Sequence, residues 1–146
     1  MSETTISAYY TDDHDRLAEL FGQFRSSKTN DPAAAREMFE EFKSGLERHI
    51  AWEEDILFPV FEAHTGMHET GPTAVMREEH RLIKHFLDTL GRKLQRGDLA
   101  TDEDETGLLT ILEEHNSKEE LILYPAIDRQ VSVRERDDVF VRMGKG

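Results

Sequence analysis

Apolar residues recur every three to four positions along most of the chain, the spacing of one face of an α-helix. Thr11 is predicted to cap a first helix whose apolar face carries Leu17, Leu20, Phe21 and Phe24. A second helix is predicted to start at Pro32, with Asp31 as its cap, and to kink or end at Pro59. Its inward positions are Met38, Phe39, Phe42, Leu46, His49, Ile50, Glu53 and Leu57.

The second half of the chain has the same periodicity. Gly71 and Pro72 are predicted to open a third helix that Gly97 closes, with inward positions Met76, His80, Ile83, Leu87, Leu90 and Leu94. Thr101 is predicted to cap a fourth helix with inward positions Leu108, Leu112, His115, Glu119 and Ile122. The "SVRERDDVFVRM" segment starts with capping-box spacing, which predicts a short fifth helix. The predicted fold is all-α: an antiparallel four-helix bundle over residues 1–130, then a short C-terminal helix and tail over residues 131–146.

Two segments share one layout, "HIAWEEDILFP" at residues 49–59 and "HNSKEELILYP" at residues 115–125. An offset of 66 residues relates the members of each pair: His14 and His80, His49 and His115, Glu53 and Glu119, Phe58 and Tyr124, Pro59 and Pro125. The simplest interpretation is a helical hairpin present twice, with an approximate two-fold axis along the bundle.

Composition limits the chemistry that this bundle can perform. The 146 residues contain no cysteine, which excludes disulfides, thiolate metal sites and cysteine nucleophiles. The formal net charge of −13 argues against binding nucleic acid or an anionic membrane surface. The sequence shows neither an apolar run long enough to span a membrane nor a secretory signal. We therefore expect a soluble, cytoplasmic protein that is a monomer or a weak oligomer.

Six polar residues fall on predicted inward faces: His14, His49, Glu53, His80, His115 and Glu119. Residues i and i+4 lie one above the other on a helix, so each His-x-x-x-Glu pair points one way. Burying carboxylates without partners costs several kcal/mol, which bound cations would offset. Six N and O ligands exceed the needs of one tetrahedral zinc and suit two metal ions bridged by carboxylates. Iron fits this ligand set best, with manganese or zinc as alternatives.

Other residues near this cluster are given structural roles. Glu54 and Glu120 recur in both halves but are predicted to face away from the metal and to pair at the surface. Phe58 and Tyr124 are interpreted as core plugs. His14, close behind its predicted cap, is expected to feel the positive end of the helix dipole. Three aromatic residues are expected to pack near the site without binding metal: Tyr9, Tyr10 and Trp52.

At the six donor positions the chain resembles the hemerythrin-like, or HHE cation-binding, family, over roughly residues 9–130. The contexts "EEDILFP", "GPTAVMREEH" and "EELILYP" are also similar. The resemblance implies a non-haem di-iron centre with an oxo or hydroxo bridge, in which all six residues bind iron and Glu53 and Glu119 bridge. Oxygen-carrying members have one more histidine where this chain has Lys84, so the site is nearer to that of the iron-centre repair proteins. Those usually carry a further, cysteine-containing N-terminal domain.

Three functions remain open at this point. The first is a di-iron protein that binds or reacts with a small diatomic ligand or peroxide (O₂, NO or H₂O₂) in sensing or in oxidative or nitrosative stress response. The second is metal binding alone, for storage or sensing of iron or oxygen, without turnover. The third is a structural or partner-binding bundle with zinc or no metal. Whether the protein is an enzyme depends on which of these holds.

Overall fold

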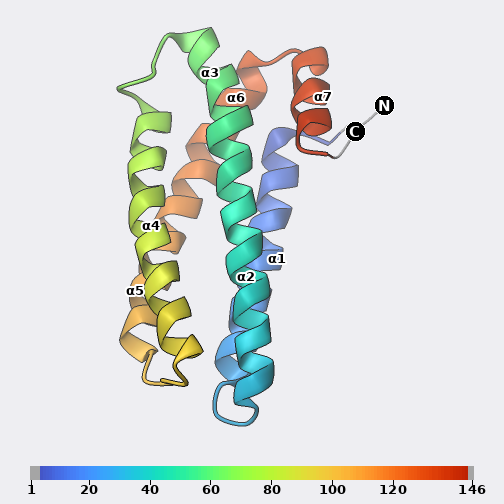
Figure 1. Cartoon of the computed structure of the whole chain (residues 1–146). Coiled ribbons are helices and arrows are strands. Elements are labelled where there is room, and N and C mark those ends of the chain that lie inside the picture. Colours follow the sequence, from blue (N-terminus) through green and yellow to red (C-terminus); the bar gives the residue numbers. More distant parts are fainter. Residues whose placement is uncertain (1–3, 145–146) are drawn as a thin grey trace.

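The computed structural model describes residues 4–144, and every regular element in that range is helical (Figure 1). The elements are α1 (Ile6–Ser27), α2 (Pro32–Trp52), η1 (Glu53–Leu57), α3 (Phe58–Thr65), α4 (Pro72–Gln95), α5 (Asp102–Lys118), η2 (Glu119–Leu123), α6 (Tyr124–Gln130) and α7 (Val133–Arg142), where η marks a π-helical turn. α2, η1 and α3 form one continuous rod, and α5, η2 and α6 form another. The predicted all-α bundle with a short fifth helix is confirmed. Within the described range, no helix is long and apolar enough to span a membrane.

Most helix boundaries lie where capping residues predict them. Asp31 caps α2 by accepting a hydrogen bond from the backbone N–H of Ala34, and the predicted capping box opens α7. The prediction for the first helix was wrong. α1 begins at Ile6, and Thr5 caps it by accepting from the N–H of Ala8 at 3.0 Å. His14 therefore lies well inside α1, too far from its start to feel the helix dipole.

The second helix does not end at Pro59. The π-helical turn η1 precedes the proline, and the backbone N–H of Phe58 donates to the carbonyl of Glu53, five residues earlier. Proline has no N–H to continue this ladder. The carbonyl of Glu54 accepts instead from Arg77 Nη2 at 3.2 Å. The helix thus continues past Pro59 because the preceding turn is the wider π-helical turn. The π-helical turn η2 precedes Pro125 in the same way.

Two buried apolar clusters fill the bundle. They lie on either side of a polar layer formed by the six predicted donors: His14, His49, Glu53, His80, His115 and Glu119. The cluster nearer the α1–α2 and α4–α5 connections includes Leu17, Phe21, Phe24, Phe39, Phe42, Leu87 and Leu108. The cluster at the opposite end includes Ile6, Tyr10, Leu57, Phe58, Leu123, Tyr124, Val139 and Phe140. The last two residues belong to α7, so this short helix helps to cover the end of the bundle.

The predicted two-fold repeat is visible in how the hairpins are joined at this end. Ser7 Oγ at the start of α1 donates to Asp128 Oδ2 of α6 at 2.7 Å. Thr73 Oγ1 at the start of α4 donates to Glu62 Oε2 of α3, also at 2.7 Å. The offset of 66 residues relates both members of the two pairs. Equivalent hydrogen bonds therefore fix the two helix starts that lead into the polar layer.

Candidate metal centre

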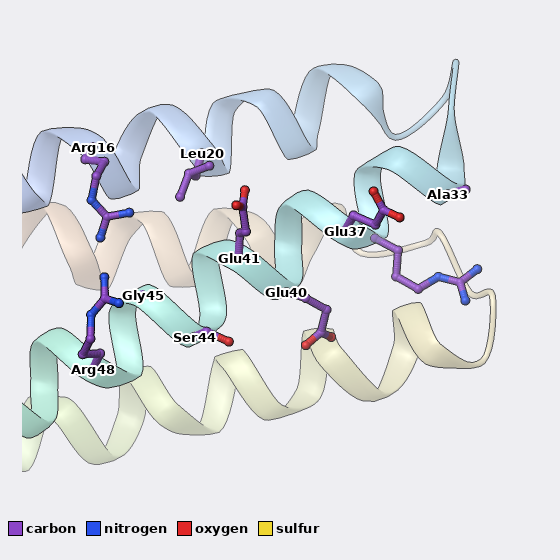
Figure 2. A pocket seen from close by; sticks show the side chains of 10 residues that line it. Arg16, Leu20, Ala33, Glu37, Glu40, Glu41, Ser44, Gly45 and Arg48 are labelled. Carbon is purple, nitrogen blue, oxygen red and sulfur yellow. The ribbon is translucent and has the colours of Figure 1, made fainter.

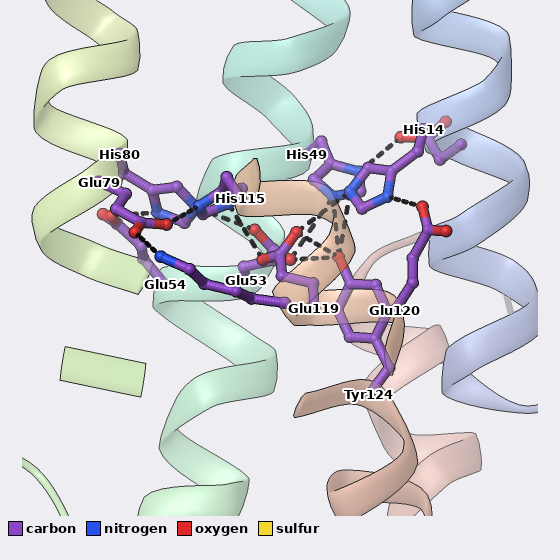
Figure 3. Close-up of polar contacts among 12 residues, drawn as sticks. His14, His49, Glu53, Glu54, Glu79, His80, His115, Glu119, Glu120 and Tyr124 are labelled. Atoms are coloured by element: carbon purple, nitrogen blue, oxygen red, sulfur yellow. Dashed lines mark hydrogen bonds and ion pairs between the residues drawn. The ribbon is translucent and has the colours of Figure 1, made fainter. Parts of the chain in front are cut away.

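The polar layer brings together all six donors that the sequence singled out (Figure 3). Every one of them is at most 5% exposed. They come from six different elements: His14 from α1, His49 from α2, Glu53 from η1, His80 from α4, His115 from α5 and Glu119 from η2. Buried histidine and glutamate side chains are costly unless paired or bound to a cation, so this layer requires a compensating interaction.

Each imidazole directs its Nε2 atom at one oxygen of a central carboxylate. The four separations are 3.1 Å from His14 to Glu119 Oε1, 3.5 Å from His49 to Glu53 Oε2, 3.0 Å from His80 to Glu53 Oε1 and 3.3 Å from His115 to Glu119 Oε2. One oxygen of each carboxylate therefore faces the His14–His49 pair, and the other faces the His80–His115 pair. This is the arrangement expected of two carboxylates that bridge two ions.

The outward nitrogen, Nδ1, of each histidine is held by a further carboxylate. The four pairs are His14 with Glu120 at 2.7 Å, His49 with Asp13 at 2.8 Å, His80 with Glu54 at 2.7 Å and His115 with Glu79 at 2.8 Å. Because a carboxylate accepts, Nδ1 carries a proton, and once the imidazole is neutral its Nε2 lone pair points to the centre. Outer carboxylates of this kind orient metal-binding histidines.

Sequence reasoning misjudged or missed these outer carboxylates. Glu54 and Glu120 were predicted to pair at the surface, and that prediction was wrong, since each holds a histidine of the other hairpin. Asp13 and Glu79 were not recognised, although each directly precedes a histidine of the cluster and the offset of 66 relates them. That repeated Asp/Glu-His pair was the available signal.

Cations lie outside three of the four outer carboxylates. Arg16 Nη2 donates to Asp13 at 2.9 Å, and Lys118 donates to Glu79. Lys84, one turn after His80, is 46% exposed, with its Nζ 3.9 Å from Glu54 Oε1. The ammonium group of Lys84 therefore lies at the rim and away from the six central donors.

The hydroxyl group of Tyr124 enters the centre from one side (Figure 3). Tyr124 is fully buried, as expected of a core plug, but its oxygen makes four polar contacts. These are 2.6 Å to Glu53 Oε2, 2.9 Å to Glu119 Oε1 and 3.3 Å to the Nε2 atoms of both His14 and His49. The π-helical turn explains this placement, because residues five apart share a face there, which aligns Tyr124 with Glu119.

On the opposite side of the centre, the position related to Tyr124 carries no hydroxyl group. Phe58, the counterpart of Tyr124, stacks on His80 with the ring planes 7° apart. Three buried polar atoms facing this side have close polar neighbours but no well-aligned hydrogen bond within residues 4–144: Glu53 Oε1, His80 Nε2 and Glu119 Oε2. An unpaired buried polar atom costs about 1–3 kcal/mol. A metal ion would satisfy all three at once, so the residues fit a bound cation on this side.

Comparison with known proteins agrees with this geometry. The family model described as the hemerythrin HHE cation-binding domain matches residues 5–127. The chain belongs to this family. It is 31% identical over 91 residues to the iron-sulfur cluster repair protein YtfE of Edwardsiella ictaluri, which covers 58% of this chain and 41% of that protein. It is 28% identical over 131 residues to an uncharacterized hemerythrin-like protein of Schizosaccharomyces pombe, covering 80% and 64% respectively.

The chain spans less than two thirds of the length of either relative. No solved structure matches it significantly. The HHE family implies a binuclear metal site, and two overlapping groups of donor atoms agree with it. One group comprises Glu53, His80, His115 and Glu119, and the other comprises His14, His49 and Glu119.

Carboxylates and imidazoles in this HHE centre shift one another's pKa values. Burial lowers the pKa of His49, but Glu53 and Asp13 outweigh burial and raise that pKa to about 10. Glu53 and Glu54 likewise raise the pKa of His80 to about 9 against the effect of burial. Burial raises the pKa of Glu53, whereas the nearby histidines hold it well below its usual range. A metal ion would displace these imidazole protons, since only a neutral imidazole binds metal.

A separate surface groove lies between α1 and α2 (Figure 2). It has a volume of about 700 Å³, and none of the six donors lines it. Its walls are formed by Arg16, Leu20, Ala33, Arg36, Glu37, Glu40, Glu41, Ser44, Gly45 and Arg48. The groove is therefore distinct from the buried HHE centre.

Proposed function

We propose that this chain is a non-haem di-iron protein that binds or reacts with O₂, NO or peroxide, in sensing or in oxidative or nitrosative stress response. The observation that carries the proposal is the paired donor set. Four imidazole Nε2 atoms face two carboxylates, and each carboxylate directs one oxygen toward each imidazole pair. Membership of the HHE family supports a binuclear centre with this ligand set.

The positions of the donors suggest which residues would bind each of two ions. His14 and His49 would hold one ion, His80 and His115 would hold the other, and Glu53 and Glu119 would bridge them. The donor set contains only nitrogen and oxygen, and mixed imidazole and carboxylate ligation suits iron. The name of one relative, an iron-sulfur cluster repair protein, also supports iron. When bound, a pair of iron ions supplies Lewis acidity and redox equivalents to a small ligand.

Burial of the centre supports a small substrate. All six donors are at most 5% exposed, and apolar clusters lie on both sides of the layer. A diatomic molecule or peroxide is small enough to reach such a centre through side-chain motion, whereas a large organic substrate is not. The surrounding hydrocarbon also excludes bulk water, which strengthens electrostatic interactions inside the site.

The outer carboxylates supply the chain's own contribution to ligand orientation. Glu54 and Glu120 each reach from one hairpin to a histidine of the other, so they fix the relative position of the two hairpins at the centre. Asp13 and Glu79 each hold a histidine within their own hairpin. All four imidazole planes are thereby fixed, which favours pre-formed metal sites over flexible ones.

The test is anaerobic loading with ferrous iron, followed by titration with O₂ and with NO under visible absorption. We expect two irons per chain and spectral changes on adding either gas. Reversible changes with O₂ would indicate binding, and irreversible oxidation would indicate redox chemistry. His80→Ala should reduce iron content, whereas His85→Ala, an exposed histidine on the same helix, should not. Absence of bound iron in the wild-type chain would contradict the proposal.

A further inference from the structure

The two halves of the centre differ by one oxygen atom, and that difference has a chemical consequence. Tyr124 brings a hydroxyl group among the donors of the His14–His49 pair, whereas Phe58 occupies the related position near His80. We propose that Tyr124 is a seventh protein ligand, which binds the ion of the His14–His49 pair through its phenolate oxygen. The inference rests on the proposed di-metal function and names a ligand that the histidine and glutamate pattern does not include.

The number of electron pairs around the Tyr124 oxygen argues for a shared cation. Two carboxylate oxygens lie at 2.6 and 2.9 Å, and two imidazole nitrogens lie at 3.3 Å. In the neutral form that binds metal, these imidazoles offer lone pairs, because their protons face Asp13 and Glu120. A single hydroxyl proton satisfies only one acceptor at a time. Five electron-rich atoms around one point are better served by a metal ion.

The distances around this oxygen also match a ligand set. Metal bonds to nitrogen and oxygen are about 2.0–2.1 Å long, so adjacent ligands at right angles on one ion lie about 2.8–3.0 Å apart. The four separations from the Tyr124 oxygen, between 2.6 and 3.3 Å, bracket this value. Hydrogen bonds to carboxylates have a similar length, but one hydroxyl proton does not account for four donors at this spacing, whereas one shared ion does.

The binding step conserves atoms and charge. The phenolic O–H bond breaks, an oxygen–metal bond forms, and the proton is released to solvent. No electron is transferred. Charge on the incoming cation stabilises the phenolate that binds it.

The consequence is that the two ions have different free positions. The ion of the His14–His49 pair would gain a fifth protein donor from Tyr124. The ion of the His80–His115 pair would keep a position that no protein oxygen fills, because Phe58 offers only a ring face beside His80. We infer that an exogenous small ligand binds this second ion, on the side of the centre lined by Phe58.

The experiment compares the diferric protein with three variants by visible absorption and resonance Raman spectroscopy. Phenolate bound to ferric iron gives a visible charge-transfer band and enhanced tyrosine ring vibrations. We expect both signals in the wild type and complete loss of both in Tyr124→Phe, which should still bind two irons at saturating metal. Tyr10→Phe is the matched control, because Tyr10 is also buried and adjacent but donates its hydroxyl proton to Met143 Sδ. That variant should keep both signals.

The reciprocal variant, Phe58→Tyr, places a hydroxyl group on the other side of the centre. We expect a stronger phenolate band and slower reaction with added azide, since the free position of the second ion is then filled. A wild type that holds two irons without a phenolate signal, or an unchanged signal in Tyr124→Phe, would overturn the proposed ligand and leave the di-iron function intact. Failure to bind iron at all would overturn both.

Discussion

The two halves of the candidate metal centre have matching histidines. They differ in the aromatic residue beside those histidines, which is Tyr124 in one half and Phe58 in the other. In each half, two imidazoles face the central carboxylates of Glu53 and Glu119, and two outer carboxylates hold those imidazoles. One half adds the Tyr124 hydroxyl group, and the other adds the flat ring of Phe58. Duplication thus accounts for two matched sets of donors, whereas a single exchanged residue makes the two sets unequal.

Residues that are the same in both halves and residues that differ between the halves have different roles in the centre. Residues that recur at the offset of 66 define what the centre is built from, because both halves need them. Residues that differ between the halves define where an added ligand has room. Both kinds lie within one buried layer, so substitutions at matched positions separate their effects.

The largest expected effect comes from removing a residue that both halves share. Glu53→Ala deletes a carboxylate that faces both histidine pairs, so we expect loss of both irons. Glu54→Ala removes only the support of His80 and should weaken affinity by roughly 10–100-fold. Iron per chain after dialysis measures both. Glu120→Ala, the counterpart of Glu54, should behave like Glu54→Ala. Equal loss in Glu53→Ala and Glu54→Ala would show that Glu53 is not a bridge.

Removing the metal should make stability depend on pH. In the folded, metal-free protein, neighbouring carboxylates raise the pKa of His49 to about 10 and that of His80 to about 9. Their unfolded values are about 6.5. The raised pKa values therefore contribute their full stabilisation of the folded state below about pH 6.5. This stabilisation is lost as the pH rises through 9 to 10. We expect the Tm of the metal-free protein to fall between pH 7 and 10.

The metal-loaded protein is the control for this pH dependence. Bound imidazoles carry no titratable Nε2 proton, so the Tm of the loaded protein should stay nearly constant over the same range. It should also be higher, because a ligand that binds only the folded state stabilises it. A metal-free Tm that is flat or rises from pH 7 to 10 would show that these histidines do not carry the charge of the empty centre.

The smallest effect is expected at the rim of the half that lacks the tyrosine. Lys84→His would place an imidazole one turn after His80, where the ammonium group now lies near Glu54. We expect slower irreversible oxidation of the diferrous protein by O₂, followed by visible absorption, because an added imidazole would offer the ion of the His80–His115 pair a further nitrogen donor. Lys84→Met removes the ammonium group without adding a donor and serves as the control. Equal oxidation rates in the wild type and Lys84→His would show that a side chain at position 84 does not reach this ion.

The periodicity of the sequence was enough to predict the fold and to single out the six donors now found in one layer. Inward positions follow from the spacing of apolar residues in an α-helix, and the repeat made each half support the other. One inward position was misjudged where that spacing changes. Ile122 was predicted to face inward but is 61% exposed, and Tyr124 contacts the donors instead. The turn before Pro125 is π-helical, so faces computed for a straight α-helix no longer apply.

The outer carboxylates could not be predicted for a related reason. Glu54 follows Glu53 directly, and adjacent residues on an α-helix point in different directions. Which neighbouring helix Glu54 reaches depends on how the hairpins pack, and sequence periodicity does not contain that information. The start of α1 was misplaced because both Thr5 and Thr11 have the side chain of a cap, and only contacts of the preceding turn with α6 distinguish them.

The most direct test is the crystal structure of the iron-loaded protein, with anomalous scattering measured at the iron edge. We expect two anomalous peaks roughly 3–4 Å apart, the usual spacing of two-metal sites, with Glu53 and Glu119 contacting both. One peak should lie among His14, His49 and Tyr124, and the other between His80 and His115. A single peak, or iron bound outside the polar layer, would contradict the assignment of this bundle as a di-iron centre.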